Sequence, residues 1–212
     1  MTSLPGVLVG HPIVPVVVID DAAIAVPAAE ALVAGGIGCI EVTLRTSAGL
    51  AAIEALQSTE IVVGAGTVLT PEDVDRVADA GARFIVTPGF APDVVARALE
   101  RGLDVLPGVA TATEVQAALR TGLGAVKLFP ADRLGGIDMI SALAGPFPTT
   151  AFVPSGGVSA ANLRAYLSHP NVPAVSGSWM IGRALLRDHD FAAIERLSRE
   201  ASAEARSIVD AP

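Results

Sequence analysis

Short apolar runs rich in β-branched residues alternate with Ala-rich stretches of helical period along the whole chain. Eight such runs predict strands, at residues 13–19, 39–44, 61–65, 84–87, 105–108, 125–129, 152–155 and 172–176. Helices are predicted between them, for example at 22–34, 71–80, 92–101, 113–120 and 160–167. Repeated strand–helix units of roughly 25 residues indicate a parallel α/β sheet, because crossover helices join parallel strands. Eight units can close into a (β/α)8 TIM barrel, the fold that we expect; a doubly wound open sheet is the alternative that periodicity leaves open.

Helix boundaries carry the usual signals. Thr70 offers an N-cap before Pro71 and an acidic first turn, and Thr111 begins a similar pattern with Glu114 three residues later. Glycines follow several predicted helix ends, as at Gly81 and Gly102. No linker or composition break divides the 212 residues. We therefore expect one domain, residues 1–212, with a short helical segment before the first strand.

Composition and charge limit the partners of the chain. The net charge of −8 argues against nucleic acid, because binding the phosphate backbone needs a concentrated basic face. Gly, Pro and charged residues interrupt every apolar run before it reaches the length that crosses a bilayer, so no membrane association is expected. The first six residues lack the basic start and apolar core of a signal peptide. These features predict a soluble cytoplasmic protein.

The residues that usually hold metals or cofactors are sparse. Cys39 is the only cysteine, so neither an intrachain disulfide nor a cysteine-based metal framework can form. His11, His169 and His189 fall in predicted loops outside the strand ends. The fragment around Gly64 and Gly66 lacks the third glycine of a dinucleotide fingerprint. We expect no metal and no cofactor.

One lysine stands among thirteen arginines, and it lies within a predicted apolar strand. A charge is costly to bury there, and Arg would serve at least as well in an ion pair or at the surface. Arg does not readily lose its proton, however, whereas a lysine amine held among apolar neighbours can become the neutral nucleophile that forms a Schiff base with a carbonyl. Lys127 is therefore predicted to be a covalent catalyst.

The second predicted strand places polar side chains on a single face. Strand alternation puts Cys39, Glu41, Thr43 and Arg45 on one side, and the residues between them point toward covering helices. In a closed barrel the polar set faces inward, with Arg45 nearest the carboxyl-terminal mouth, where barrel active sites lie. This segment alone fits a structural Glu–Arg pair equally well. Lys127 has the same inward parity, and the combined ionisable set is typical of a reaction centre.

Small-residue turns close the predicted strands. The last two turns, at residues 155–157 and 176–178, follow strands 7 and 8 and combine glycines with serine hydroxyls. Barrels often bind phosphate there through backbone N–H groups and helix amino termini. A tight βα turn is the simpler explanation, and the hydroxyls favour phosphate binding over it.

Taken together, these residues resemble the family of 2-keto-3-deoxy-6-phosphogluconate (KDPG) and 4-hydroxy-2-oxoglutarate (KHG) aldolases. The matching motifs keep the family's order and cover nearly the whole chain: EVTLRT (41–46), VGAGTVL (63–69), PG (88–89), LPGV (106–109), KLFPA (127–131), PSGGV (154–158) and GSW (177–179). The resemblance implies a (β/α)8 barrel, a homotrimer, and a class I aldolase that works without a metal.

The resemblance also implies roles for individual positions. Lys127 matches the Schiff-base lysine and Glu41 the general acid/base. Arg45 and Thr67 match the groups that hold the pyruvyl carboxylate. The remaining positions expected at the substrate site, which include the phosphate cradle, are Thr87, Pro88, Phe129, Ser155, Gly156, Gly157, Ser176, Gly177 and Ser178. Two of them depart from the family pattern: Ser155 stands where Thr is common, and Ser176 where Gly is common.

The implied reaction cleaves KDPG to pyruvate and glyceraldehyde 3-phosphate, and also 4-hydroxy-2-oxoglutarate to pyruvate and glyoxylate. Ser155 lies where the family is thought to control stereochemistry at the bond-forming carbon, so an aldolase for the galactonate-type epimer is one alternative. A barrel that binds a sugar phosphate without catalysis is a second. A third is another phosphate-binding barrel enzyme such as an isomerase, epimerase or synthase, which an imine trap would distinguish.

Overall fold

The computed structural model describes residues 4–209. The amino-terminal six residues, which show no signal-peptide features, are therefore described only from residue 4 onward. Within the described part, no helix is long and apolar enough to cross a membrane. A three-residue 3₁₀ helix, η1 (Gly6–Leu8), precedes the first strand, where a short helical segment is predicted.

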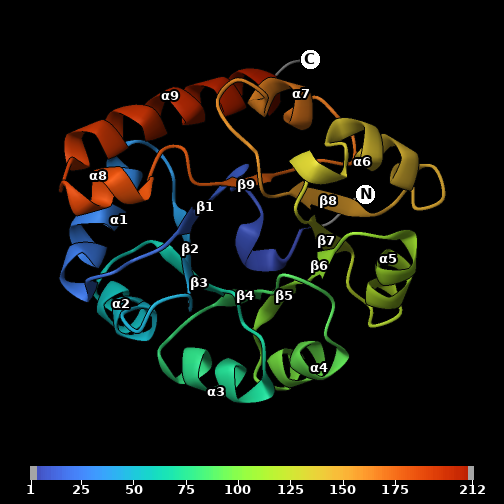
Figure 1. The fold of residues 1–212 in the computed structure, drawn as a ribbon, viewed down its shortest axis with the longest axis horizontal. Helices are drawn as coiled ribbons and strands as arrows, with labels where there is room; N and C mark the ends of the chain where they lie inside the picture. Colours follow the sequence, from blue (N-terminus) through green and yellow to red (C-terminus); the bar gives the residue numbers. More distant parts are fainter. Residues whose placement is uncertain (1–3, 210–212) are drawn as a thin grey trace.

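Every strand pairs in parallel with its neighbours, as the alternating pattern predicts. One sheet has the order β5-β4-β3-β2-β1-β9 and a second has the order β6-β7-β8. The strands are β1 (Ile13–Val17), β2 (Cys39–Thr43), β3 (Val62–Gly66), β4 (Phe84–Val86), β5 (Asp104–Leu106), β6 (Gly108–Val109), β7 (Ala125–Leu128), β8 (Ala151–Pro154) and β9 (Val175–Gly177). The result is an α/β fold around a curled parallel sheet (Figure 1).

The two sheets approach each other at two places. The strand predicted at 105–108 is divided into β5 and β6 at Pro107, because proline has no N–H to donate to a ladder. Its carbonyl still accepts a hydrogen bond from the Lys127 N–H at 2.8 Å. On the other side, an isolated parallel bridge joins Ser155, just after β8, to Ser176 in β9.

Helices surround the strands on the outside (Figure 1). They are α1 (Ala25–Ala34), α2 (Gly49–Ala55), α3 (Pro71–Asp79), α4 (Pro92–Glu100), α5 (Ala112–Leu119), α6 (Ile137–Ala144), α7 (Leu163–Leu167), α8 (Arg183–Arg187) and α9 (Phe191–Val209). The predicted caps are confirmed: Thr70 accepts from the N–H of Asp73, and Thr111 and Glu114 form a reciprocal capping box. Each cap satisfies N–H groups that the first turn leaves free.

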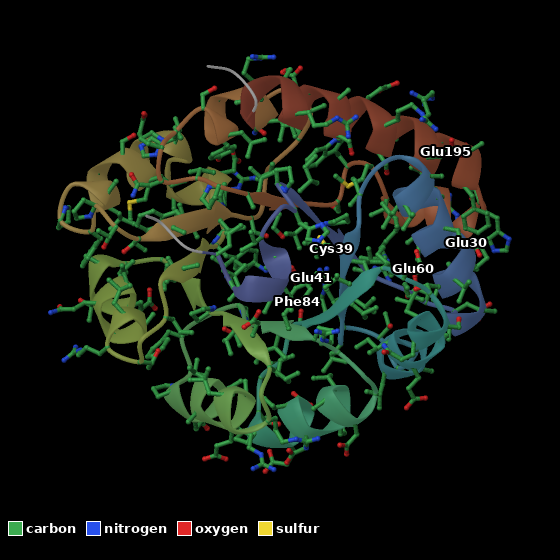
Figure 2. All side chains as sticks on the ribbon, turned by 180° about the vertical axis from the view of Figure 1, so that it is seen from behind. Glu30, Cys39, Glu41, Glu60, Phe84 and Glu195 are labelled. Carbon is green, nitrogen blue, oxygen red and sulfur yellow. The ribbon has the colours of Figure 1, made fainter. Side chains whose placement is uncertain are left out.

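The buried side chains form two layers, and strand alternation decides which layer each one joins. Ile40, Val42 and Val126 pack between the sheet and the helices. Cys39 and Ala125 belong to a smaller cluster inside the curled sheet, together with Leu8 from η1, Val14, Phe84, Val86, Leu106, Ala151, Val153 and Ala174. Figure 2 shows Cys39, Glu41 and Phe84 near the centre of the molecule. The predicted inward parity of β2 and β7 is therefore confirmed.

Apolar residues and η1 fill the interior near the amino-terminal ends of the strands. Leu8 is fully buried, and Asp104 accepts a hydrogen bond of 2.8 Å from the Val7 N–H, which holds η1 in place. The polar inward residues Glu41 and Lys127 lie farther along their strands. Because apolar side chains fill the interior at the amino-terminal ends of the strands, only the carboxyl-terminal ends are left to form a polar site.

Candidate active site

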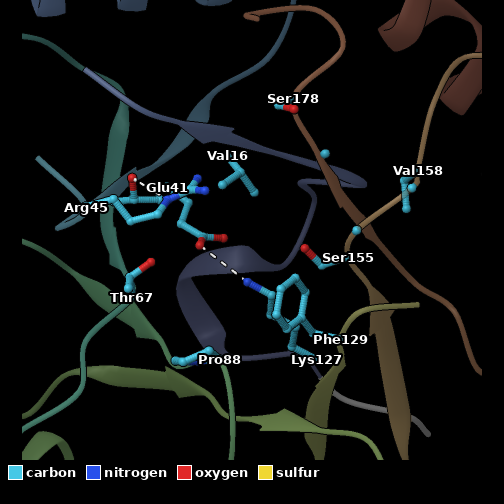
Figure 3. A pocket seen from close by; sticks show the side chains of 14 residues that line it. Val16, Glu41, Arg45, Thr67, Pro88, Lys127, Phe129, Ser155, Val158 and Ser178 are labelled. Carbon is cyan, nitrogen blue, oxygen red and sulfur yellow. Dashed lines mark hydrogen bonds and ion pairs between the residues drawn. The ribbon is translucent and has the colours of Figure 1, made fainter. Parts of the chain in front are cut away.

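A cavity of about 360 Å³ opens at the carboxyl-terminal ends of the strands (Figure 3). Its walls come from strands far apart in the sequence and from the turns that follow them. The lining residues are Val16, Glu41, Thr43, Arg45, Thr67, Pro88, Lys127, Phe129, Ser155, Gly156, Gly157, Val158, Gly177 and Ser178. This is the face at which parallel α/β barrels build their sites.

Glu41 and Lys127 meet inside the cavity. Lys127 Nζ lies 3.5 Å from Glu41 Oε1, and their side chains are only 8% and 1% exposed. Lys127 Nζ also lies 5.3 Å from the centre of the Phe129 ring. A buried pair with so little solvent has no structural advantage over apolar residues of similar volume, because desolvation offsets its Coulomb attraction. The pair is better explained by chemistry that needs an amine beside a carboxylate.

Neighbouring strands fix where these two groups lie. Lys127 is central in its sheet, opposite Gly108 of β6 and Val153 of β8. Glu41 has Gly64 of β3 as its register partner, and Gly66 at the end of that strand leaves room for the carboxylate. A Cβ at Gly66 would lie 2.2 Å from Glu41 Oε1. Glycine is therefore required at position 66, because the Glu41 side chain lies too close to this backbone for a Cβ to fit.

Arg45 follows β2 in a turn and is exposed at the cavity. Its Nε donates to Thr43 Oγ1 at 3.3 Å, and that hydroxyl donates its own proton to the Val17 carbonyl at 3.0 Å. Within residues 4–209 no carboxylate forms an ion pair with Arg45, so its terminal nitrogens face the cavity unneutralised. In Figure 3 the Glu41 carboxylate lies between Arg45 and Thr67 on one side and Lys127 on the other. A planar carboxylate can be held bidentately by such a guanidinium.

The turn after β8 has a left-handed backbone that exposes N–H groups. Gly156 and Gly157 have φ of 87° and 86°, and a Cβ on Gly157 would lie 2.2 Å from the Asp132 Cβ. In the described part of the chain, no backbone carbonyl accepts from the N–H groups of Gly156, Gly157, Val158 or Ser178. Successive free N–H groups of this kind can bind an anion.

The helices that follow the two glycine turns are predicted to add positive dipole ends there, and the structure does not support this contribution. Instead α7 and α8 have five residues each and begin at Leu163 and Arg183, several residues beyond the turns. Short helices carry little macrodipole, so any anion here depends on the turn N–H groups and hydroxyls.

Eleven of the thirteen residues expected at the site line the cavity, and Thr87 and Ser176 do not. Thr87 is buried, and its hydroxyl donates to the Gly89 carbonyl at 2.7 Å and accepts from the Gly108 N–H at 3.1 Å. Ser176 is fully buried, and its Oγ lies 3.4 Å from Glu41 Oε2. The Thr87 hydroxyl thus links the end of β4 to β6, whereas the Ser176 hydroxyl contacts Glu41.

Three lining residues were not predicted: Val16, Thr43 and Val158. Strand alternation did place Thr43 on the inward face between Glu41 and Arg45, but no role at the site was assigned to it. The two valines carry no polar signal, since valine in a strand or turn is ordinary.

The buried thiol of Cys39 reports on the charge nearby. Its pKa is raised to about 12, first by burial and second by the negative charge of Glu41. Its Sγ donates to the Ile13 carbonyl at 3.3 Å. Between residues 4 and 209 there is no group of three or more His, Cys, Asp or Glu residues that could hold a metal ion. The ionisable side chains that line the cavity are Glu41, Arg45 and Lys127, which supply a carboxylate, a guanidinium and an amine.

Comparisons with known proteins agree on one family. The sequence model of the KDPG and KHG aldolase family matches residues 6–197 of this chain. The 2-dehydro-3-deoxy-phosphogluconate aldolase of Pseudomonas aeruginosa is 47% identical over 191 residues, which cover 89% of this chain and 87% of that protein. A KDPG aldolase from Legionella pneumophila, solved with pyruvate captured at low pH as a covalent carbinolamine intermediate, superposes with a TM-score of 0.90 at 39% identity, covering 95% of this chain and 99% of that chain. The KDPG aldolase of Zymomonas mobilis ZM4, solved with 3-phosphoglycerate, gives a TM-score of 0.88 at 41% identity over 93% of each chain.

Proposed function

The chain belongs to the KDPG and KHG aldolase family, and from this membership we propose that it cleaves KDPG to pyruvate and glyceraldehyde 3-phosphate through an imine on Lys127. It is a carbon–carbon lyase of the KDPG aldolase type. The observation that carries the residue assignment is the Lys127–Glu41 contact of 3.5 Å inside a cavity that also holds Arg45. Cleavage of 4-hydroxy-2-oxoglutarate is a second proposed activity, supported by membership of a family that includes KHG aldolases. The alternatives of galactonate-type and non-catalytic barrels are not favoured by these relatives.

Catalysis begins when the neutral amine of Lys127 attacks the C2 ketone, and loss of water from the carbinolamine gives an iminium ion. Glu41 takes the proton of the C4 hydroxyl, directly or through a water. The electrons of the C3–C4 bond move into the iminium, so the aldehyde leaves and an enamine remains. Glu41 then returns the proton to C3, and hydrolysis releases pyruvate and restores the amine. Glu41 lies near enough to Lys127 to reach an imine formed on it.

Arg45 is assigned to the substrate carboxylate. Thr43 occupies its Nε, so the two terminal nitrogens are left to hold the carboxylate bidentately. Such a clamp fixes the ketone against the amine, and positioning of this kind lowers the barrier because the reactants are already aligned. Thr67, with φ of 60°, shares this side of the cavity and is assigned as a second donor to the carboxylate.

Borohydride trapping tests the imine. Pyruvate plus borohydride should add one reduced adduct at Lys127, the only side-chain amine in the chain, as located by mass spectrometry. Lys127→Arg keeps the charge and should lose both adduct and turnover, and a melting curve checks that it folds. Lys127→Met serves if Arg is not tolerated. An adduct confined to the amino-terminal amine, or normal turnover in a folded variant, would overturn the assignment.

Phosphate recognition is proposed for the turn at residues 155–157 and for Gly177 and Ser178 at the cavity end of β9. The free N–H groups of Gly156, Gly157 and Ser178 support it. Charge-assisted hydrogen bonds contribute roughly 1.5–3 kcal/mol each, so two should give KDPG a kcat/KM more than ~100-fold above that of the unphosphorylated acid. Ser178→Ala should raise KM for the phosphorylated substrate alone, with the unphosphorylated acid as the matched control. Equal kcat/KM for both substrates would remove phosphate from the proposal.

The assembly and setting are also proposals. We propose that residues 1–212 form one domain whose two sheets close into a (β/α)8 barrel, supported by the Pro107 carbonyl contact and the Ser155–Ser176 bridge. A crystal structure with an open gap at either place would contradict closure. We further propose a cytoplasmic homotrimer, on the resemblance to the family. Light scattering that gives any mass other than three chains would contradict the trimer.

A further inference from the structure

The two carboxylate oxygens of Glu41 have different neighbours. Oε1 lies 3.5 Å from Lys127 Nζ, and Oε2 lies 3.4 Å from Ser176 Oγ. Glu41 is 1% exposed and Ser176 is 0% exposed, so both contacts are shielded from bulk solvent. Among the described residues, the Ser176 hydroxyl donates its hydrogen bond to the Glu41 carboxylate and to no other acceptor.

The backbone holds Ser176 firmly in this position. Ser176 is the middle residue of β9, opposite Val14 of β1, and it bridges Ser155 on its other side. The side chain points inward and reaches Glu41 on a strand that lies 135 residues away in sequence. Because Ser176 does not line the cavity, its contribution is to the carboxylate rather than to the substrate.

We propose that the Ser176 hydroxyl is a positioning group that fixes the Glu41 carboxylate for proton transfer. By donating to Oε2, it leaves Oε1, the oxygen that faces Lys127, to take the proton from the C4 hydroxyl and return it to C3 of the enamine. Protonation at Oε2 would displace this hydrogen bond, so Oε1 is the preferred proton carrier. The proposal rests on the aldolase function proposed above. A contact of 3.4 Å is long, and catalytic hydrogen bonds often tighten when substrate binds.

Deuterium exchange at C3 of pyruvate isolates this step. The exchange needs the imine, the enamine and the Glu41 proton, but no phosphorylated substrate. Loss of a hydrogen bond to a charged group should slow the exchange about tenfold in Ser176→Ala, with KM for KDPG within about twofold of wild type. Ser176→Thr keeps a hydroxyl and should recover most of the rate. Ser198→Ala is the matched control, since Ser198 is equally buried and its hydroxyl has no hydrogen-bond partner in the described residues.

A pH profile separates positioning from a purely structural role. A hydrogen bond to a carboxylate favours its charged form, so in Ser176→Ala the acidic limb of the exchange rate should move to higher pH. The other groups that face Glu41 are the Lys127 amine, the Arg45 guanidinium and the Cys39 thiol, and all three are retained in the variant. A slower rate with an unmoved limb would contradict positioning of the carboxylate.

The outcomes distinguish this proposal from the function on which it rests. If borohydride traps no adduct in the wild type, the aldolase function fails. If the adduct forms normally and Ser176→Ala exchanges at the wild-type rate, the role of Ser176 fails alone. A rise confined to KM would also overturn it, because that result indicates substrate binding. If Ser176→Thr does not fold, Ser176→Gly must show the same loss as Ser176→Ala, because both lack the hydroxyl but differ in volume.

Discussion

A single methyl group at Gly66 should disable the site while leaving the fold intact. In Gly66→Ala the new Cβ would lie 2.2 Å from Glu41 Oε1, 2.8 Å from its Cγ and 2.9 Å from its Cδ. All three atoms belong to one side chain, so the backbone can stay while the carboxylate moves. Gly66 does not have positive φ, so alanine can adopt its conformation.

The size of the effect follows from the displacement. Ordinary van der Waals contact begins at 3.4 Å, so Oε1 would have to retreat by 3.4 − 2.2 = 1.2 Å to reach it. A misplacement of about 1 Å in a catalytic group can cost roughly 100-fold in rate. We therefore expect kcat to fall about 100-fold. Overpacking of a buried site typically costs about 1–3 kcal/mol of stability, which should leave the protein folded at assay temperature.

Two other glycines provide matched controls. A Cβ at Gly89 would have no other atom within 4 Å, so Gly89→Ala should change neither kcat nor Tm appreciably. A Cβ at Gly64 would lie 2.2 Å from the fully buried ring of Phe84, so Gly64→Ala should lower Tm more than Gly66→Ala does. Pyruvate release coupled to lactate dehydrogenase gives kcat, and thermal melts give Tm.

The refuting result is clear for this series. If Gly66→Ala keeps kcat within about threefold of wild type, the position of Glu41 does not matter for catalysis. If its loss of activity matches its loss of folded protein, the effect is on stability. Only a folded, inactive Gly66→Ala beside an active Gly89→Ala supports the reasoning.

Three further outcomes are expected. The pKa of Cys39 is about 12 because of burial and the charge of Glu41, so Ellman's reagent at pH 8 should react far more slowly with native than with unfolded protein, and equal rates would contradict that environment. Hydrogen bonds from Arg97 and Arg101 lower the pKa of Asp75, so its stabilising effect is present above the ordinary value of 3.8 and is lost as the pH falls through the lower folded value. Asp75→Asn should thus lower Tm at pH 7, in a salt-dependent way, by an amount that shrinks in acid; a constant difference would count against the ion pairs. EDTA should leave kcat unchanged because the iminium is the electron sink, whereas a loss restored by zinc would contradict the class I mechanism.

The local parts of the fold could be read from the sequence because they depend on near neighbours. Strand alternation placed Cys39 and Ala125 inside the sheet, and Thr111 with Glu114 formed the expected capping box. Lys127 and Glu41 could be singled out because a lone lysine and a carboxylate in apolar strands are costly to bury. Strand alternation also indicated Arg45, and the small-residue turns indicated residues 155–157 and 176–178. Family resemblance supplied the other site positions, and most of the expected positions line one cavity.

Residue type and strand period therefore determined the fold class and the reactive groups, since both are properties of short segments. Only the tertiary structure decided which groups meet. The contact of Lys127 with Glu41 spans 86 residues, and that of Ser176 with Glu41 spans 135. Both depend on the register of several strands and on Gly66 lacking a Cβ. Periodicity gives the direction of a side chain, but a distance between strands is fixed by packing and hydrogen-bond register, which no short segment contains.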